Sequence, residues 1–554
     1  MSDGSPRRAV PAAAIAGAIV FACLFFKGGV LGFIGPDEPR YAAIAREMTE
    51  TGDWITPRLH SHPWFEKPVL YYWAAAASFE LSGVSESSAR VPSAAAAALT
   101  LLALAWVGWR AYGGATAYAF ALMFPTTVAA IGFGRAATTD MLFAATLSLA
   151  LVAAARLIFG PRFQPDASRP RADTIHNSLT WLVLWGASIG LGLLAKGPAA
   201  VVLAGGSLAL WLAATRRWRD LLTLIHPVGI TACLAVALPW YLLCAARNPE
   251  FMQVFLLQHN LQRYLTGIFR HDEPLWYFGP ILLLGLIPWT PLLVLLVRDG
   301  WKARSVGDWK HSLGLFISCW VAFPLIFFSL SQSKLPGYIL PVVSPLMLLM
   351  AHSTRLAIER QSAVVRQMLA GVGGTFVLLA AAVFISVRQA PVGLRVALGG
   401  FDSVLAFAGA AVLAGGLIAF VALRRRAWLS IALAASLVAA FVLGLTTMVV
   451  PPLDAYFTAR NAAAAVRRAA AARPIFVYQL HYAWRYGLDY YFEGVLPEWQ
   501  TGETGVVVAS EAGVRDLVLR GYLVRQLDRP SRGVVIVDLE PRAIRGADPV
   551  LTNQ

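Results

Sequence analysis

Long apolar stretches recur along almost the whole chain, and they constrain the fold more than any other feature of the sequence. Each is about 17–25 residues long, the length that a helix needs to cross the hydrocarbon core of a bilayer. Hydrophobic residues make up 58% of the 554 residues and charged residues only 14%, and a soluble protein of this size does not need so much apolar surface. The sequence therefore predicts a polytopic α-helical membrane protein with about thirteen spans. The predicted spans are residues 10–34, 91–109, 114–133, 141–158, 179–195, 198–215, 224–245, 276–297, 312–330, 337–353, 367–387, 403–423 and 429–450.

Basic residues cluster in alternate loops between these stretches. When Arg7 and Arg8 are placed at the inner face, every other strongly basic cluster falls on the same side, which the positive-inside rule identifies as the cytoplasm. An odd number of spans then places the C-terminus outside. The formal charge of +15 is explained by this topology, so we expect a lipid bilayer and no nucleic acid as partner. The four cysteines all lie within apolar stretches and predict neither a disulfide framework nor a metal knuckle.

The composition changes after Pro451 and Pro452. A helix-like stretch, 454–473, precedes strand-like runs at 474–478, 505–508 and 533–537, with a further helix near 511–520. We therefore expect a transmembrane part at 1–450 and a soluble α/β domain at 451–554. Within the transmembrane part, residues 35–90 form an outer loop with interfacial helices, one of them at the aromatic-rich stretch 69–84.

The predicted outer loops mix acids, bases, aromatics and prolines, whereas the inner loops are merely basic. The run GPDEPRY (35–41) directly follows the first span, and a carboxylate pair at a membrane boundary is more easily explained by chemistry than by packing. Topology gathers the outer loops at one face, where their charges can share a water-filled cavity. Such a cavity suits a phosphate-bearing amphiphile, because Arg offers a bidentate fork and Lys a point charge. The candidates are Asp37, Glu38, Arg40, Tyr41, Glu66, Lys67, Asp140, Lys196, His259, Arg263, Arg270, Lys334 and Tyr338.

Each candidate also has a structural alternative. Asp37 and Asp140 could cap helices, and Lys67 and Lys196 could be anchors that extend to the lipid headgroups. Tyr338 could belong to the interfacial aromatic belt. A single His is more often a hydrogen-bonded structural residue than a metal ligand.

Five motifs resemble those of the bacterial lipid A aminoarabinose transferases, which form glycosyltransferase family 83 of the polytopic GT-C superfamily. Their joint occurrence in order spans most of the membrane part. The resemblance implies a GT-C fold with thirteen spans, a catalytic membrane domain and a periplasmic C-terminal α/β domain. The motifs are GPDEPRYA (35–42), WFEKPVLYYW (64–73), GRAATTD (134–140), LAKGP (194–198) and SKLPGY (333–338).

The resemblance also implies an activity. Such enzymes move 4-amino-4-deoxy-L-arabinose from undecaprenyl phosphate to a phosphate of lipid A, at the periplasmic face of the bacterial inner membrane, and so confer resistance to polymyxin and other cationic peptides. By position, Asp37 and Asp140 are the implied catalytic residues of an inverting transfer. Lys67, Arg263, Lys196 and Tyr338 would bind the donor phosphate, and Glu38, Arg40, Tyr41, Arg270 and Lys334 would line the acceptor cavity. No cofactor is required, although Glu66 and His259 are candidates for a divalent zinc or magnesium site.

Other functions stay open on the sequence alone. A related polyprenyl-phosphate-sugar transferase, which moves mannose or galacturonic acid to another glycan or to protein, would have the same fold, because nothing in the outer loops fixes the sugar. A secondary transporter is a more remote alternative. The sequence shows neither an inverted repeat nor paired broken helices in matching halves, which transporter folds usually have. A lipid-binding scaffold without chemistry is a further alternative.

Overall fold

The computed structural model describes residues 6–160, 172–255, 273–303, 313–391, 394–395, 398, 400–471, 473–531 and 533–541. The chain divides into two compact units. The membrane unit comprises Met1–Gly29 and Ile44–Met448, and the C-terminal unit comprises Val30–Ala43 and Val449–Gln554. Helix α2 (Asp37–Thr51) begins in the C-terminal unit and ends in the membrane unit.

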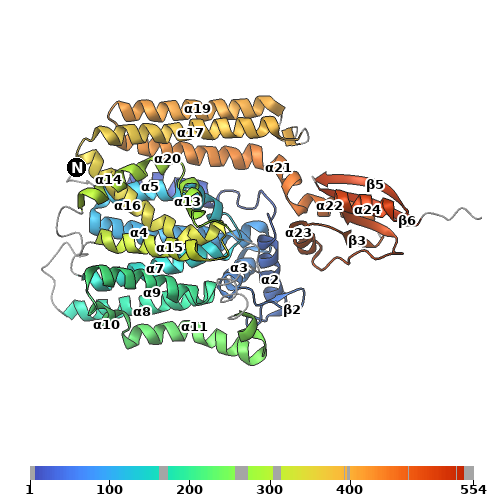
Figure 1. The fold of residues 1–554 in the computed structure, drawn as a ribbon, viewed down its shortest axis with the longest axis horizontal. Helices are drawn as coiled ribbons and strands as arrows, with labels where there is room; N and C mark the ends of the chain where they lie inside the picture. The colour runs from blue at the N-terminus through green and yellow to red at the C-terminus, as the bar shows by residue number, and fades with distance from the viewer. Residues whose placement is uncertain are drawn as a thin grey trace, which may run out of the picture. The chain divides into compact units, whose positions relative to one another are not determined.

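The membrane unit consists mainly of helices (Figure 1). In the described part of the chain, nine helices are long and apolar enough to cross a membrane, and up to eleven spans result if each of two bent helix pairs is one span. Two shorter apolar helices, Pro11–Phe25 and Ala199–Thr215, add to these. Together they coincide with the predicted apolar stretches. The prediction of a polytopic α-helical fold is therefore confirmed, and the chain is a multi-pass membrane protein.

The helices of the membrane unit before residue 200 are α1 (Pro6–Val20), the π-helix η1 (Phe21–Phe25), α3 (Leu70–Ser82), α4 (Glu86–Tyr112), α5 (Gly114–Met123), η2 (Phe124–Thr126), α6 (Val128–Gly134), α7 (Thr139–Phe159), α8 (Ala172–Lys196) and α9 (Ala199–Thr215). Those that follow are α10 (Asp220–Leu224), α11 (Pro227–Arg247), α13 (Phe278–Gly285), η6 (Thr290–Leu292), α14 (Leu293–Ala303), α15 (Leu313–Leu330), η8 (Pro336–Ile339), α16 (Leu340–Glu359), α17 (Ala363–Gln389), α19 (Gly400–Leu423), α20 (Ala427–Gly444) and η9 (Leu445–Val449). A two-stranded hairpin, β1 (Arg58–Leu59) and β2 (His62–Pro63), precedes α3.

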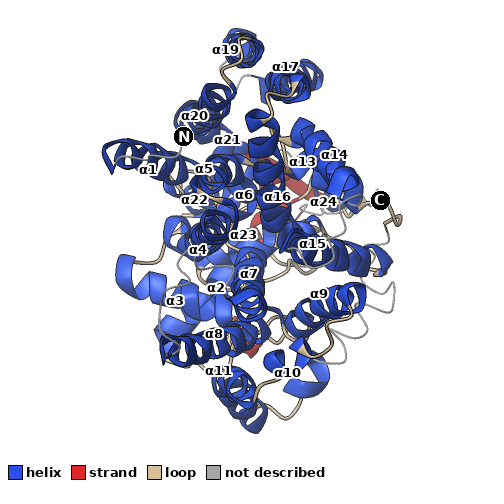
Figure 2. Cartoon of the chain, turned by 90° about the vertical axis from the view of Figure 1, so that its left-hand side faces the viewer, coloured by secondary structure: helices blue, strands red, loops and turns tan. Residues whose placement is uncertain are grey.

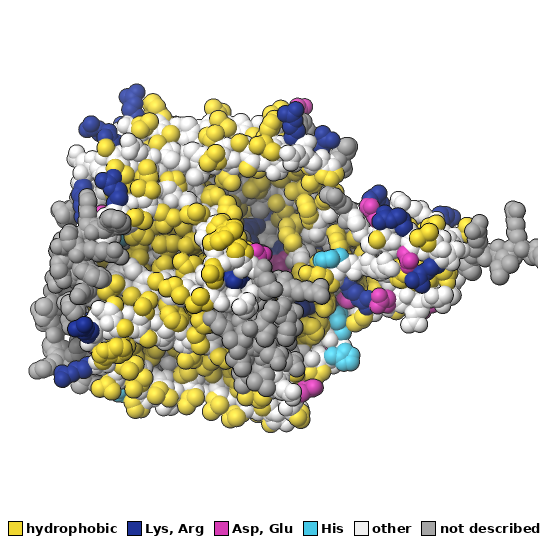
Figure 3. All heavy atoms as spheres, viewed as in Figure 1, with side chains coloured by type: hydrophobic (Ala, Val, Ile, Leu, Met, Phe, Trp, Pro, Cys, Tyr) yellow, Lys and Arg dark blue, Asp and Glu magenta, His cyan; other side chains and the backbone are white. Residues whose placement is uncertain are grey.

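Burial separates central helices from peripheral ones within the membrane unit. The apolar windows of α7 and α16 are 78% and 83% buried, whereas those of α11 and α17 are only 17% and 28% buried. Figures 1 and 2 show the same order, with α17 and α19 at one margin, α8 and α11 at the other, and α7 and α16 between them. Hydrophobic side chains cover much of the described helical surface (Figure 3). Such a surface is what helices facing lipid require.

The C-terminal unit contains a four-stranded sheet with the strand order β3-β4-β6-β5. Strands β3 (Ile475–Tyr478) and β4 (Gly505–Ala509) are parallel, while β6 (Val534–Pro541) is antiparallel to both β4 and β5 (Tyr522–Ser531). All five residues of β4 are buried, because helices cover both faces of the sheet. Val506 and Val508 join the core with α22 (Ala459–Ala470) and α23 (Tyr482–Phe492), and Val507 and Ala509 join the core with α24 (Glu511–Leu519). Helix α21 (Val450–Phe457) precedes α22.

The three predicted strand runs coincide with β3, β4 and β6, and the helix expected near 511–520 is α24. Strand β5 and helix α23 were not predicted. Polar and charged residues predominate in β5 from Arg525 onward without a regular alternation, and the residues of this strand are mostly partly or fully exposed. The sequence also gave no indication that Val30–Ala43, which follows the first predicted span, packs with the C-terminal unit.

Candidate active site

The GPDEPRYA motif (35–42) forms the turn that begins helix α2. Asp37 and Glu38 stand in its first turn, where the helix dipole favours negative charge. The Glu38 side chain accepts a hydrogen bond from the backbone N–H of Ile34 at 2.8 Å, and Glu38 is 6% exposed. The Asp37 side chain is 48% exposed and forms an ion pair with Arg40. The two adjacent carboxylates therefore differ, because Glu38 closes the turn and Asp37 is open to solvent.

Arg40 lies between this turn and aromatic rings. Its Nε donates to the carbonyl oxygen of Pro36 at 3.1 Å, and its guanidinium lies 5.9 Å from the ring centroid of Tyr41 and 5.1 Å from that of Tyr486. Both separations are within the range of cation–π attraction. The Arg40 side chain is only 13% exposed. Several contacts therefore fix the guanidinium beside Asp37.

Three helix ends of the membrane unit bring Asp140, Lys196 and Tyr338 together. Asp140 lies in the first turn of α7, Lys196 is the last residue of α8, and Tyr338 belongs to η8, directly before α16. The Lys196 ammonium forms an ion pair with Asp140 and lies 4.9 Å from the ring centroid of Tyr338. The Lys196 and Asp140 side chains are 14% and 21% exposed. An ammonium in this setting is partly desolvated yet still accessible to an anion.

Small residues make this approach possible. Gly197, with φ of 67°, takes the left-handed conformation that ends α8, and Pro198 leads into α9. Gly337 lies directly against Asp140, since a Cβ added there would stand 2.8 Å from the Asp140 Cγ and Oδ2 atoms. The LAKGP motif thus contains Lys196 and the glycine that ends its helix. The SKLPGY motif contains Tyr338 and the glycine that lets this segment approach Asp140.

The other described candidates lie as follows. Glu66 Oε1 and Lys67 Nζ are 3.2 Å apart, with side chains 12% and 15% exposed. They immediately precede α3, which begins at Leu70. The ammonium of Lys334 donates to the carbonyl oxygens of Glu273 and Ser331, at 2.8 and 2.6 Å, and Lys334 is 5% exposed. These contacts make Lys334 a brace between two loops.

His259, Arg263 and Arg270 lie outside the described residues. Within the described ranges, no group of three or more His, Cys, Asp or Glu side chains is arranged to hold a metal ion. Glu66, the described half of the predicted metal pair, forms an ion pair with Lys67.

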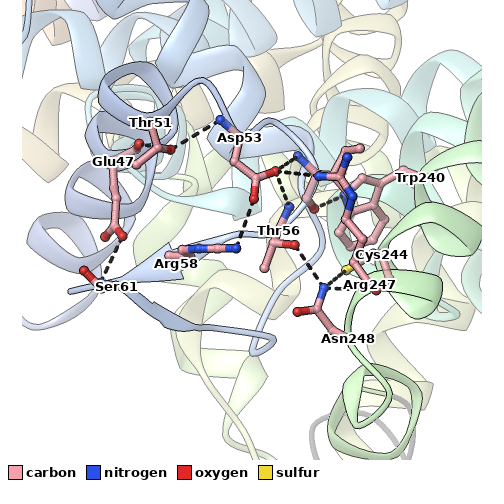
Figure 4. A network of polar contacts seen from close by, with 11 residues as sticks. Glu47, Thr51, Asp53, Thr56, Arg58, Ser61, Trp240, Cys244, Arg247 and Asn248 are labelled. Carbon is pink, nitrogen blue, oxygen red and sulfur yellow. Dashed lines mark hydrogen bonds and ion pairs between the residues drawn. The ribbon is translucent and has the colours of Figure 1, made fainter.

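A polar network that the sequence did not predict anchors the loop between α2 and α3 to helix α11 (Figure 4). The Asp53 carboxylate accepts from the backbone N–H of Thr56 at 3.2 Å and pairs with Arg58 at 3.1 Å and Arg247 at 3.2 Å. Asn248 Nδ2 also donates to the Thr56 hydroxyl at 3.0 Å. The one local signal for this network is Asp53 itself, which directly follows Gly52. An Asp in a turn commonly accepts hydrogen bonds from backbone N–H groups a few residues ahead, as Asp53 does from Ile55 and Thr56.

Phe143 is a second residue that the sequence analysis missed. Its ring centroid lies 5.3 Å from the Lys196 ammonium. Phe143 follows Asp140 by three residues on α7, and residues at this spacing share a helix face. Lys196 is therefore held between two aromatic rings and one carboxylate.

Comparison with known proteins relates this arrangement to polyprenyl-phosphate-dependent transferases. Residues 14–255 match the dolichyl-phosphate-mannose-protein mannosyltransferase family. An undecaprenyl phosphate-alpha-4-amino-4-deoxy-L-arabinose arabinosyl transferase of Edwardsiella ictaluri is 32% identical over 377 residues, which are 66% of this chain and 65% of the relative. The corresponding protein of Erwinia tasmaniensis is 33% identical over 318 residues, which are 57% of this chain and 54% of the relative. The chain thus aligns with less than two thirds of the length of either relative.

The fold agrees over nearly the full length with a solved structure. ArnT of Cupriavidus metallidurans, determined bound to undecaprenyl phosphate, superimposes with a TM-score of 0.76 and 24% sequence identity. The superposition covers 96% of this chain and 98% of that one. The same protein in its apo state gives a TM-score of 0.72. These values show that the membrane helices and the C-terminal sheet follow a GT-C architecture.

Proposed function

Because the chain is a sequence relative of the undecaprenyl phosphate-aminoarabinose arabinosyl transferases and shares the ArnT fold, we propose that it is an integral membrane glycosyltransferase. It would transfer 4-amino-4-deoxy-L-arabinose from undecaprenyl phosphate to a phosphate of lipid A. The observation that carries the proposal is the half-buried cluster of Asp140, Lys196 and Tyr338 at one end of the membrane helices. A cation held there can bind the phosphate of a lipid-linked donor.

We place the reaction at the periplasmic face of the bacterial inner membrane. The basic residues of the sequence gather in alternate loops, which orients those loops toward the cytoplasm. The candidate residues belong to the opposite loops and would therefore face the periplasm. Lipid A acquires the sugar on that side in the proposed reaction, which reduces the negative charge presented to polymyxin and other cationic peptides.

Cations at the helix ends provide the donor site in this proposal. Lys196 and Lys67 bind the phosphate of undecaprenyl phosphate together with Arg263, and Tyr338 supports Lys196 through its ring. As the bond between the sugar and the donor phosphate breaks, negative charge builds on the leaving phosphate. Fixed ammonium groups stabilise this charge more than the charge of the bound donor. The undecaprenyl tail lies along the apolar helices.

The transfer is a direct, inverting displacement. An oxygen of the lipid A phosphate forms a bond to the anomeric carbon while the bond from that carbon to the oxygen of undecaprenyl phosphate breaks, and undecaprenyl phosphate leaves. The attacking group is already an anion, so it needs little deprotonation. Asp37 orients the reacting groups and stabilises the positive character of the sugar ring, while Asp140 holds Lys196 in place. Arg40 and Arg270 bind the acceptor phosphate, and Glu38, Tyr41 and Lys334 shape the surroundings.

Mass spectrometry of lipid A tests this function. A polymyxin-sensitive strain that lacks its own transferase but makes the donor would express the wild-type chain, Asp37→Asn or Glu50→Gln. We expect the aminoarabinose mass increment with the wild type and with Glu50→Gln, since the Glu50 side chain is 61% exposed and pairs with Arg46 on the same helix. Asp37→Asn should reduce the increment by at least about 100-fold, as loss of a group acting on the reacting atoms does.

Two outcomes would contradict parts of the proposal. Unmodified lipid A, with the wild-type protein inserted and the donor present, would show that this pair of substrates is wrong. A full increment with Asp37→Asn would show instead that Asp37 does not act in the transfer.

The match to the mannosyltransferase family favours one second candidate, the transfer of a polyprenyl-phosphate-linked hexose to protein or to another glycan. Membranes that contain the chain would be incubated with undecaprenyl phosphate linked either to aminoarabinose or to mannose, and with lipid A or an acceptor protein. Transfer of mannose alone would replace the main proposal with this one.

A further inference from the structure

Asp454 is a buried carboxylate surrounded by hydrogen-bond donors in the C-terminal unit. It lies in helix α21 and is 4% exposed. Its oxygens accept from the Thr458 hydroxyl at 2.9 Å, from Arg460 Nε at 2.9 Å and from Asn461 Nδ2 at 3.1 Å. A buried charge requires this level of pairing, because desolvation without partners is costly.

The same cluster holds a segment more than four hundred residues earlier in the chain. The backbone N–H of Gly32 donates to Asp454 Oδ1 at 2.6 Å, and Arg460 Nη2 donates to the carbonyl oxygen of Val30 at 2.7 Å. A Cβ added at Gly32 would stand 2.6 Å from the Thr458 hydroxyl oxygen and 2.9 Å from the Tyr491 hydroxyl oxygen. The backbone at Gly32 is therefore fixed by polar bonds and by close packing.

Aromatic contacts extend this hold toward helix α2. Phe33 is 3% exposed, and its ring meets Tyr490 edge-on at a centroid distance of 4.8 Å. The Phe33 N–H donates to the Tyr491 hydroxyl at 3.3 Å. Tyr486 and Tyr490 are four residues apart on α23, and Tyr486 carries the guanidinium of Arg40. Helix α23 thus contacts both sides of the turn that begins α2.

Asp37 lies at the end of this series of contacts. The turn from Ile34 to Glu38 is closed by the bond between the Ile34 N–H and the Glu38 carboxylate, and Arg40 pairs directly with Asp37. All of these residues belong to the same compact unit. The α/β domain therefore fixes the backbone of the segment that carries Asp37.

We propose that the C-terminal α/β domain is a positioning device for the Asp37 turn, and that Asp454 and Arg460 are positioning residues of the transfer reaction. This inference rests on the proposed function in one respect, the action of Asp37 on the transferred sugar. The described residues that we assign to the donor phosphate, Lys67, Lys196 and Tyr338, belong to the membrane unit. Loss of the Asp454 cluster should consequently impair turnover and leave donor binding intact.

The chain offers a matched control in the same unit. Asp538 on β6 is also a buried carboxylate, 6% exposed, and it pairs with Arg473 at 2.7 Å and with Arg525 at 3.6 Å. Arg473 precedes β3 and Arg525 lies on β5, so both partners lie outside the segment Val30–Ala43. Asp538→Ala therefore removes a comparably buried carboxylate without disturbing the contacts of the Asp37 turn.

The test compares Asp454→Ala, Gly32→Ala and Asp538→Ala in the full-length protein reconstituted in lipid nanodiscs. Three quantities are measured per folded protein: kcat, KM for the sugar donor, and the affinity for undecaprenyl phosphate itself. We expect kcat to fall on the order of 100-fold for Asp454→Ala, because displacing a reacting group by about 1 Å costs this much. Gly32→Ala should lower kcat about 10-fold by the same mechanism. KM and undecaprenyl phosphate affinity should stay within about twofold, and Asp538→Ala should keep the wild-type kcat.

Several results would overturn the inference. Equal kcat values for Asp454→Ala and Asp538→Ala would reduce the cluster to a purely structural role. A changed undecaprenyl phosphate affinity with unchanged kcat would assign the domain to donor binding. If Asp454→Ala does not fold, Gly32→Ala decides alone, since it keeps every charge of the cluster. Asp37→Asn separates this inference from the proposed function: an inactive Asp37→Asn beside fully active cluster variants rejects only the positioning role.

Discussion

Two carboxylate–cation pairs in this molecule differ in how completely they are satisfied. Asp454 is 4% exposed and accepts hydrogen bonds from four residues. The donors are the backbone N–H of Gly32, the hydroxyl of Thr458 and the side chains of Arg460 and Asn461. The described residues give Asp140 one cationic partner, Lys196, and its side chain is 21% exposed. The Asp454 carboxylate holds the backbone at Gly32 and cannot exchange its partners without a large loss of stability. The open pair can exchange partners when an anion arrives, and this property suits a ligand site.

Removal of the Lys196 ammonium, which breaks the solvent-accessible pair between Asp140 and Lys196, should have the largest effect on activity. In the proposed reaction, Lys196→Ala deletes the charge that stabilises the leaving phosphate and leaves Asp140 as an uncompensated negative charge beside the donor. We expect kcat/KM to fall by about 10² to 10³, as when a single preorganised donor is lost from an active site. A radiolabelled-donor assay in membranes measures this loss.

Lys27→Ala is the matched control for this prediction. Lys27 also places its ammonium near an aromatic ring, 5.8 Å from the centroid of Phe26, but it follows helix η1 and is not part of the pair between Asp140 and Lys196. Its substitution should leave kcat/KM unchanged. Equal losses for the two variants would mean that Lys196 contributes only to the general charge of the membrane unit.

A steric change at Gly337 sharpens the comparison, because it disturbs the open pair without removing a charge. The methyl group of Gly337→Ala would stand 2.8 Å from Asp140 Cγ and 3.0 Å from the Phe133 ring. Asp140 must shift, and Lys196 with it, so we expect kcat/KM to fall about 10-fold, within the range for small displacements of catalytic groups. Gly374→Ala on α17 has no heavy atom within 4 Å of the new Cβ and should retain full activity. Wild-type activity of Gly337→Ala would show that the position of Asp140 is not critical.

The sequence predicted the membrane fold well because hydrophobic length is a local property. Each span can be identified without knowledge of its neighbours. The same holds for β4, since strands covered on both faces have continuous apolar runs. The motifs around Lys196 and Tyr338 also led to residues that the structure brings together with Asp140, because the ends of successive spans alternate between the two membrane faces.

Features that depend on distant contacts could not be predicted. The bond between Gly32 and Asp454 joins residues 422 positions apart, and no pattern around either residue indicates the other. The sequence likewise gave no indication that Glu38, predicted to line the acceptor cavity, differs in exposure from Asp37, the implied catalytic residue. The difference arises because the backbone N–H of Ile34 donates to the Glu38 carboxylate, which is buried, while the Asp37 carboxylate stays exposed to solvent. Lys334 was predicted to line the acceptor cavity, and its contacts with two carbonyl oxygens depend on how two loops meet.

Asp489 on α23 provides the mildest test of the comparison, because it is buried with fewer partners than Asp454. It is 3% exposed, accepts from the Leu496 N–H at 3.0 Å, and lies 4.0 Å from Arg485 Nε. Burial raises the pKa of this carboxyl to about 6, although the Leu496 bond and the Arg485 charge both oppose the shift. The unfolded chain loses this proton near pH 4. The stabilising contribution is therefore complete below about pH 4 and is lost as the pH rises through about 6.

Asp489→Asn should remove this dependence and be more stable than the wild type at pH 7.5, by on the order of 1 kcal/mol after allowance for solvent screening. Thermal unfolding of the full-length protein in detergent, from pH 4.5 to 7.5, measures the difference between variant and wild type. Asp516→Asn is the control of opposite sign. The Tyr478 hydroxyl and Arg520 lower the pKa of Asp516, so its contribution is present at neutral pH and is lost only as the pH falls below its usual range. A stability difference for Asp489→Asn that stays constant across this window would mean that Asp489 is as well satisfied as Asp454, and burial with few partners would then not distinguish the two carboxylates.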